Sequence, residues 1–290
     1  VIGTYNSGVA FQTAPILGAA SIAQISPANT DPALTLGPDP ANPVRPFVNY
    51  FRMVVPDTVQ GPVLARFAFN NLGLRRVAVV TESKSVSQGL ANNFSLELTN
   101  LGGTVLITEV VPALTTDYSA ILARVAATNP ELLFYGGEYQ TAATVRLQAR
   151  QAGIAAPLMG GDGIKDDAYI ADTGAASEGD FASTVGAPLA SLPGGARVLQ
   201  DYQAAGFPDP PTDYGPFAYD ATNTLIAALA ATLSNTNSFD TTSRANILTQ
   251  LQATRSSGVT GAVAFDAFGD PVNELLTIYQ VQNGRWVPVP

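Results

Sequence analysis

The sequence contains no histidine and no cysteine. Without histidine, Ser-His-Asp and Cys-His catalysis, histidine-ligated zinc and the usual general base near neutral pH are excluded. Without cysteine, disulfides, thiolate metal sites and cysteine nucleophiles are excluded. The remaining candidates for catalytic groups are carboxylates, tyrosines and two lysines, Lys84 and Lys165. We therefore predict that the chain is not an enzyme, uses no cofactor and binds no metal.

Positive charge is also scarce. The chain has 14 Lys and Arg against 23 Asp and Glu, a net charge of −9, which disfavours extended contact with nucleic acid or anionic membranes. No apolar run approaches the ~20 residues that span a bilayer, and the sequence as given contains no signal segment. By contrast, 46% hydrophobic and 13% charged residues predict a large core. The 290 residues suffice for two compact lobes or one large α/β domain.

The middle of the chain alternates short apolar runs with helical segments. Such β-branched runs are typical of strands buried on both faces, and we expect strands at 77–81, 104–111, 132–135 and 157–160. Helices are expected to end near 101, to start at 116 and to cover 141–152. Short connections between alternating elements predict a parallel sheet with helices on both faces, a doubly wound lobe.

Further strand and helix patterns flank this region. Strands are expected at 1–3, 23–25, 263–265 and 275–281, with hairpin-like turns at 266–270 and 283–284. A helix is expected over 218–233, with Leu225, Ala228, Leu229 and Leu233 forming its core stripe. The opening strand is as apolar as an interior strand yet has nothing before it, so we expect an N-terminal portion of the first lobe to be missing.

Polar turns follow several of the expected strands. In an open parallel sheet, ligands bind outside the carboxyl ends of the strands, so the turns to consider are 4–8, 26–31, 136–139 and 160–163. Each combines small residues, which let a ligand approach the main chain, with one or two polar side chains.

These turns carry a resemblance to a known family. Val1-Ile-Gly3, Ile25-Ser-Pro-Ala-Asn-Thr30, Tyr135-Gly-Gly137, Met159-Gly-Gly-Asp-Gly163 and Tyr214-Gly-Pro-Phe-Ala-Tyr-Asp220 follow one another at spacings that resemble the type I periplasmic binding proteins. The branch that this chain most resembles binds branched-chain amino acids (Leu/Ile/Val) for ABC transporters. The resemblance extends over essentially all of the chain.

The resemblance implies a fold and a domain division. Members of this family have two doubly wound parallel-sheet α/β lobes, and the ligand binds in the cleft between them. We expect lobe 1 at 1–56 and 187–272, incomplete at its N-terminus, and lobe 2 at 57–186 and 273–290.

The resemblance also implies roles for individual residues. The ligand's α-carboxylate is expected at Ser7, the main chain of Ala28, and Thr30. Its α-ammonium is expected at Asp162, with Glu138 facing the same group. The ligand side chain is expected to be lined by Tyr5, Asn6, Asn29, Val86 and Tyr214.

Several of these residues depart from the pattern of the leucine binders. Tyr5, Asn6 and Asn29 make the expected side-chain pocket more polar, and an apolar ligand would leave amide groups unpaired at a cost of ~1–3 kcal/mol each. Glu138 and Asp162 would place two carboxylates near one ammonium, which favours a more cationic ligand or a raised carboxylate pKa. These features predict an amino acid rather than leucine in particular, and disfavour anionic ligands.

Other interpretations of these residues stay open from the sequence. Ser7, Thr30 and Asp162 could cap helices, and Glu138 could point to solvent. Tyr214 and Tyr219 could be core aromatics, an interpretation that we favour for Tyr219. Lys84 and Lys165 could be ordinary surface lysines.

The resemblance implies a function. The chain would be a monomeric extracytoplasmic solute-binding protein, periplasmic or on the outer face of the cell envelope, that delivers an amino acid to the membrane permease of an ABC transporter. A ligand-binding sensor or regulator with the same fold is the alternative. A nucleotide-dependent enzyme is disfavoured because the chain contains no G-x-G-x-x-G turn at its first strand and no G-x-x-x-x-G-K-[ST] loop.

Overall fold

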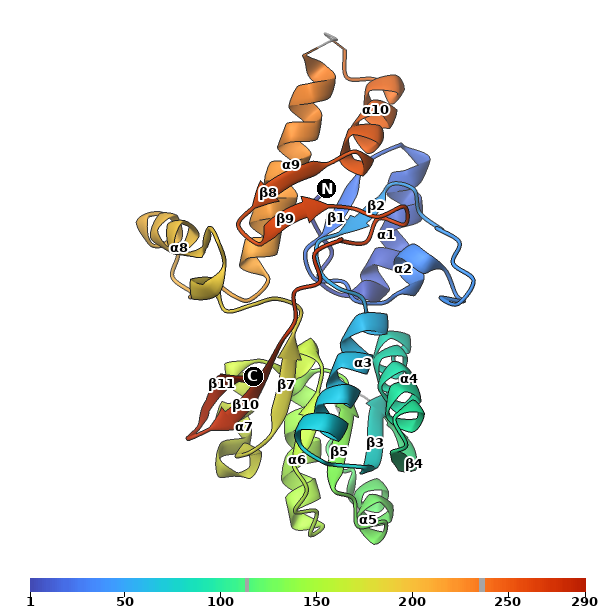
Figure 1. The fold of residues 1–290 in the computed structure, drawn as a ribbon, viewed down its shortest axis with the longest axis vertical. Helices are drawn as coiled ribbons and strands as arrows, with labels where there is room; N and C mark the ends of the chain where they lie inside the picture. The colour runs from blue at the N-terminus through green and yellow to red at the C-terminus, as the bar shows by residue number, and fades with distance from the viewer. Residues whose placement is uncertain (113–114, 235–237) are drawn as a thin grey trace. The chain divides into compact units, whose positions relative to one another are not determined.

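The computed structural model describes residues 1–112, 115–234 and 238–290, apart from the side chains of Ser85 and Val86. The chain forms two compact units, each made of two segments (Figure 1). Unit 1 consists of Val1–Pro56 and Val185–Leu276, and unit 2 of Asp57–Thr184 and Thr277–Pro290. The chain thus passes between the units after residues 56, 184 and 276, where the sequence analysis placed the passages after 56, 186 and 272.

Unit 2 is built on one seven-stranded sheet with the strand order β11-β10-β7-β6-β5-β3-β4. Five neighbouring strands, β7, β6, β5, β3 and β4, are parallel to one another. Strand β10 pairs with β7 and with β11 in the antiparallel sense. The strands are β3 (Arg76–Glu82), β4 (Thr104–Val111), β5 (Leu132–Gly136), β6 (Leu158–Gly160), β7 (Phe181–Thr184), β10 (Thr277–Gln282) and β11 (Arg285–Val289). This mostly parallel sheet confirms the predicted doubly wound fold class.

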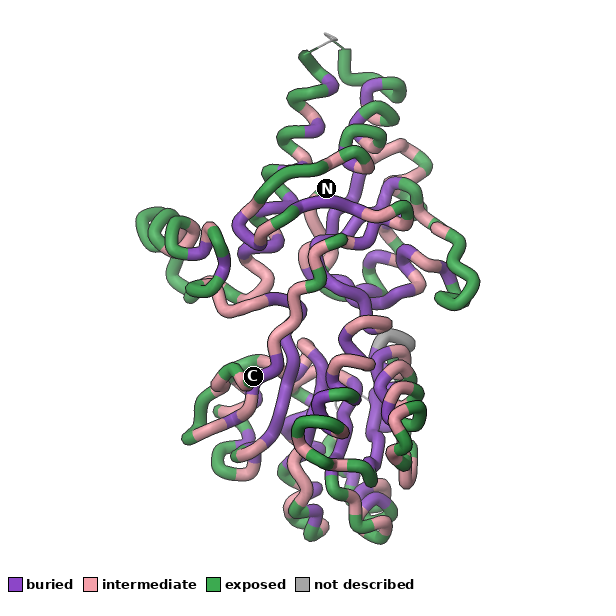
Figure 2. The backbone as a smooth tube through the Cα atoms, in the orientation of Figure 1, coloured by how far each residue is buried: buried purple, intermediate pink, exposed green. Residues whose placement is uncertain are grey.

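Helices cover both faces of this sheet, and its inner strands are buried along almost their whole length (Figure 2). On one face, the Phe94 ring stacks on Phe134 with 3.8 Å between ring centroids. On the other, Leu133 packs into a cluster with Leu122 and Val145. The helical segments are α3 (Asp57–Arg66), η1 (Phe67–Asn71), α4 (Ser85–Asn100), α5 (Ser119–Ala127), α6 (Tyr139–Gln151), η2 (Asp162–Ile164), α7 (Asp167–Thr173) and η3 (Gly174–Ser177).

The tail of unit 2 contains the hairpin that the Asn283-Gly284 pair predicts. Both residues adopt positive φ, 53° and 71°, as a two-residue type I′ turn requires. The Glu178 carboxylate accepts hydrogen bonds from both backbone N–H groups, at 2.8 and 3.3 Å. A short sequence signal thus specifies this connection, and a distant side chain stabilises it.

A buried ion pair joins the helices of unit 2 to its central strands. Arg146 on α6 contacts the Asp180 carboxylate at 2.7 Å, and both side chains are fully buried. Asp180 also accepts hydrogen bonds from the N–H of Leu158, where β6 begins, and from the Tyr169 hydroxyl on α7. Burial raises the pKa of Asp180 to about 7, although Arg146 opposes this shift. The pair fixes β6, the strand that leads to Asp162.

Removing one partner of this pair would leave a buried charge without compensation. We expect Arg146→Met to lower the free energy of unfolding of unit 2 by ~3–5 kcal/mol, measured by urea denaturation. The matched control is Arg124→Met, which removes the exposed Arg124–Glu109 pair and should cost less than about 1 kcal/mol. Equal effects of the two substitutions would contradict this role for Arg146.

Unit 1 contains a smaller parallel arrangement. Strands β1 (Gln24–Ser26) and β2 (Tyr50–Arg52) pair in parallel, and Ile2 adds a single parallel bridge to Ile25. The strand expected at 1–3 is therefore reduced to that bridge. A separate antiparallel hairpin is formed by β8 (Arg255–Gly258) and β9 (Gly261–Ala264). The helical segments are α1 (Ser7–Ala19), α2 (Ala33–Leu36), η4 (Leu189–Ser191), α8 (Gly195–Ala204), α9 (Gly215–Leu233) and α10 (Thr241–Gln252).

Of the core stripe predicted for α9, only Ala228 is fully buried. Its buried residues are mainly small, and Leu225 and Leu229 are only partly covered while Leu233 is exposed. Tyr219, which the sequence analysis favoured as a core aromatic, is 47% exposed, so that interpretation was wrong. Two stripes of residues on this helix have helical spacing, one rich in leucine and one of smaller residues. The stripe of smaller residues is the buried one: Ala221, Thr224, Ala228 and Thr232.

None of the described helices is long and apolar enough to cross a bilayer.

Candidate functional site

The first group of predicted site residues meets at one edge of unit 1. Because Ile2, β1 and β2 run in parallel, the turns after them lie at the same edge. The Ser26 hydroxyl joins two of these turns: it accepts from the N–H groups of Ala28 and Asn29, at 3.1 and 2.9 Å, and donates to the Thr4 carbonyl at 2.8 Å. The turn at 26–30 is thereby held against residues 4–7.

Ser7 and Thr30 are both nearly buried within this group, at 5% and 7% exposure. The Ser7 hydroxyl oxygen accepts from the N–H of Asp31 at 3.3 Å. Neither residue caps a helix, because the N-cap of α1 is Asn6 and that of α2 is Pro32. The capping alternative for Ser7 and Thr30 was therefore wrong.

Asn29 does not occupy the place predicted for it. Its side chain is fully buried and donates to the Tyr5 carbonyl at 2.7 Å. Its amide oxygen accepts from the hydroxyls of Tyr50 and Thr4, at 2.9 and 3.2 Å. The prediction that Asn29 lines the ligand's side chain was therefore wrong: its amide is consumed inside unit 1, so it would not be left unpaired by an apolar ligand.

Arg52, which was not predicted from the sequence, holds the 26–31 turn through its carbonyl groups. Its guanidinium donates to the carbonyls of Asn29 and Asp31, at 3.1 and 2.8 Å, and contacts the Asp270 carboxylate at 2.6 Å. It also donates to the Thr35 hydroxyl. The available signal was one arginine in the otherwise apolar run Tyr50-Phe-Arg-Met-Val-Val55. Arg52 fixes the main chain beside Thr30, and Asp270 neutralises its charge.

Two predicted residues of this group, Tyr5 and Asn6, are exposed, and Tyr214 is partly buried. Asn6 is exposed, and Tyr5 is 63% exposed. The Tyr5 ring meets the Tyr214 ring edge-on, with 5.3 Å between centroids. Tyr214 precedes α9, so unit 1 brings together two aromatic residues that lie far apart in the sequence.

Because the Asn29 side chain makes only internal contacts, its loss should act on stability. We expect Asn29→Ala to lower the melting temperature of the ligand-free protein by several degrees, since buried hydrogen-bonding groups of Tyr5, Tyr50 and Thr4 lose a partner at a cost of ~1–3 kcal/mol. Differential scanning calorimetry measures this. Asn6→Ala, an exposed asparagine in the neighbouring 4–8 turn whose side chain does not cap α1, should change the melting temperature little. An unchanged melting temperature for Asn29→Ala would contradict the structural role.

The second group lies at the carboxyl edge of the parallel strands of unit 2. The turns after β5 and β6 approach each other closely there: a Cβ at Gly163 would lie 2.6 Å from the carbonyl oxygen of Gly137. A Cβ at Gly137 would lie 2.6 Å from Glu82 Oε1. Both positions therefore require glycine, and the close approach brings the turns that carry Glu138 and Asp162 together.

Asp162 is held by Gln60. Its Oδ1 accepts from Gln60 Nε2 at 3.0 Å, and its N–H donates to Gln60 Oε1 at 2.8 Å. The Ser183 hydroxyl also donates to Gln60 Oε1, at 2.6 Å. The N-cap of η2 is Gly161, so the capping alternative for Asp162 was wrong. Gln60 on α3, itself bound by Ser183 on β7, thus positions a half-buried carboxylate.

Glu138 does not simply point to solvent. Its Oε2 lies 3.0 Å from the ammonium of Lys84, which also lies 3.1 Å from Glu82 Oε2. Partial burial alone would lower the pKa of Lys84, but hydrogen bonds to Glu138 and Glu82 outweigh this effect and raise it. Lys84 is thus a surface lysine, with a side chain 41% exposed, that pairs with two carboxylates. Lys165 packs over the Tyr279 ring, with 4.8 Å to the centroid.

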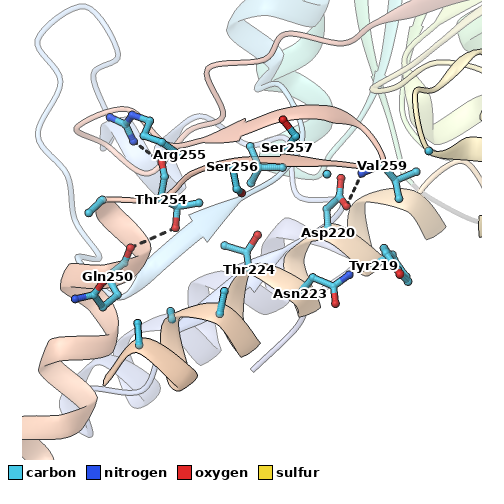
Figure 3. A pocket seen from close by; sticks show the side chains of 17 residues that line it. Tyr219, Asp220, Asn223, Thr224, Gln250, Thr254, Arg255, Ser256, Ser257 and Val259 are labelled. Carbon is cyan, nitrogen blue, oxygen red and sulfur yellow. Dashed lines mark hydrogen bonds between the residues drawn. The ribbon is translucent and has the colours of Figure 1, made fainter. Parts of the chain in front are cut away.

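Val86 cannot be placed in this group, because its side chain lies outside the described residues. A pocket of about 670 Å³ in unit 1 contains none of the predicted site residues. It is lined by residues of α9, α10 and the β8–β9 hairpin (Figure 3). The buried Asp220 carboxylate in this pocket already accepts hydrogen bonds from the N–H groups of Val259 and Thr260, each at 2.8 Å. We do not assign the site to this pocket.

Known proteins resemble almost the whole length of this chain. A family model described as periplasmic binding protein matches residues 1–285. A Leu/Ile/Val-binding protein homolog from Brucella abortus is 28% identical over 285 residues, which are 98% of this chain and 72% of the relative.

Solved structures agree on the fold. A leucine-binding protein from Thermotoga maritima has a TM-score of 0.84 at 26% identity, covering 100% of this chain and 78% of that one. A branched-chain amino acid transporter substrate-binding protein from Streptococcus pneumoniae, solved with isoleucine, has a TM-score of 0.81 at 21% identity, covering 100% and 79%. The chain, with its doubly wound sheet and polar turns at the strand ends, belongs to the periplasmic binding protein family.

Proposed function

We propose that this protein is an extracytoplasmic solute-binding protein that captures an amino acid and delivers it to the membrane permease of an ABC transporter. One ligand would be bound by residues of both units, which we propose to act as the two lobes of the family. Because such a ligand gains all its contacts only when both lobes hold it, binding would favour the closed state. We further propose that the protein acts as a monomer, outside the cytoplasmic membrane and without nucleic acid.

The observation that carries this proposal is the convergence of Ser7 and the 28–31 turn at one edge of unit 1. A carboxylate there would meet the hydroxyls of Ser7 and Thr30 and the main chain at Ala28. Main-chain N–H and hydroxyl groups are suitable donors to an anion. Arg52 holds the turn in shape while its own charge is paired with Asp270, so the donors are fixed before the ligand arrives.

Asp162 supplies the opposite charge in the proposal. Its carboxylate lies beside Gly161 and Gly163, where the absence of side chains lets a ligand approach. An α-ammonium at Asp162 and an α-carboxylate at Ser7 and Thr30 would together select a zwitterion. The relatives named for binding Leu/Ile/Val support this ligand class. The exposed Tyr5 ring and the partly buried Tyr214 ring would contact the ligand's side chain.

The proposal is tested by thermal denaturation of the protein with a panel of ligands. Neutral amino acids should raise the melting temperature in proportion to RT ln(1 + [L]/Kd). Nucleotides, sugars and dicarboxylates complete the panel. A shift with nucleotides or sugars and none with amino acids would overturn the proposal.

A single isosteric substitution tests the ammonium partner. Asp162→Asn should weaken amino-acid binding by ~2–4 kcal/mol, because a desolvated ammonium loses its countercharge. Isothermal titration calorimetry measures the change. The control is Asp167→Asn, which removes an exposed carboxylate from the start of α7 in the same unit and should leave affinity unaltered. Equal affinities for both variants would eliminate Asp162 as the ammonium partner.

A further inference from the structure

Lys84, Glu82 and Glu138 form a three-residue ion cluster at the carboxyl edge of unit 2. Glu82 ends β3, Lys84 precedes α4 and Glu138 precedes α6. The ammonium of Lys84 lies 3.1 Å from Glu82 Oε2 and 3.0 Å from Glu138 Oε2. One cation thus bridges two carboxylates that come from different strand ends.

The two carboxylates differ in what they can offer a ligand. Glu82 is fully buried, and its Oε1 already accepts from the Tyr135 hydroxyl and the N–H of Glu138, at 3.0 and 2.9 Å. The Glu138 side chain is 38% exposed, and its turn lies against the turn that carries Asp162. Glu138 is therefore the member of the cluster that faces the proposed ligand site.

The charge of the cluster depends on Lys84. The two glutamates and the lysine sum to −1, and without the lysine the sum is −2. A cationic side chain on a bound ligand would find Glu138 already paired and a second ammonium beside it. Bringing two ammonium groups near each other in a partly desolvated site costs free energy, so the lysine acts against such ligands.

We infer that Lys84 is a specificity-determining residue: it occupies the position beside Glu138 that a cationic ligand group would take, and so restricts the site to amino acids with uncharged side chains. This inference rests on the proposed function. It replaces the expectation, made from the sequence, that Glu138 and Asp162 together favour a more cationic ligand.

The test is the ratio of dissociation constants for L-lysine and L-leucine, measured by isothermal titration calorimetry on the whole chain. The unsubstituted protein should bind leucine more tightly. Lys84→Met should lower the lysine-to-leucine ratio by roughly tenfold or more, because the Glu138 carboxylate loses its internal cation. The control is Arg124→Met, which also removes one positive charge from an ion pair of unit 2, on α5, and should leave the ratio within about threefold.

A second substitution identifies the carboxylate involved. In the Lys84→Met/Glu138→Gln double variant the ratio should return to within about threefold of the original, because the released carboxylate is gone. If Lys84→Met does not fold, because buried Glu82 loses its partner, Lys84→Met/Glu82→Gln removes that charge and keeps Glu138. The same fall in the ratio is expected.

The outcomes separate this inference from the proposed function. If the unsubstituted protein binds no amino acid of the panel, the proposed function fails. If it binds leucine but the ratio in Lys84→Met, or in its Glu82→Gln partner variant, stays at the original value, the inference alone is overturned. A structural surface pair would change stability by up to about 1 kcal/mol and leave the ratio unchanged.

Discussion

The polar turns at the strand ends keep their shape because buried side chains hold their main chains. In unit 1, Arg52 donates to two carbonyls of the 26–31 turn, and the Ser26 hydroxyl accepts from two of its N–H groups. In unit 2, Glu82 binds the N–H of Glu138 and Gln60 binds that of Asp162. Every proposed ligand contact depends on this support, since a binding group must be held in place before the ligand arrives.

Ion pairs inside each unit determine which charges the proposed site presents to a ligand. In unit 1, Arg52 is paired with Asp270 behind the turn, so the groups offered to a carboxylate are neutral. In unit 2, Lys84 takes up the charge of Glu138. Arg52 and Lys84 are therefore each paired with carboxylates of their own unit. What each unit presents to a ligand follows from how these pairs are arranged.

The sequence predicted the parts of this molecule that depend on local pattern. The apolar runs gave β3 to β6 within two residues at each end, because strands buried on both faces have a strong signature. It did not reveal β2, where Arg52 interrupts a short apolar run, or the inward face of α9, where two residue sets share the helical period. The roles of Asn29 and Lys84 were not predicted either, because each depends on a partner far away in the sequence. Asn29 binds Tyr5, more than 20 residues away, and Lys84 binds Glu138, more than 50 residues away.

The central claim is that one zwitterion is bound through its carboxylate by unit 1 and through its ammonium by unit 2. A crystal structure of the protein with a bound amino acid tests it most directly. We expect the α-carboxylate within hydrogen-bond distance of the hydroxyls of Ser7 and Thr30, and the α-ammonium of the same molecule beside Asp162. An amino acid bound to one unit alone, or in the pocket beside α9, would contradict the account.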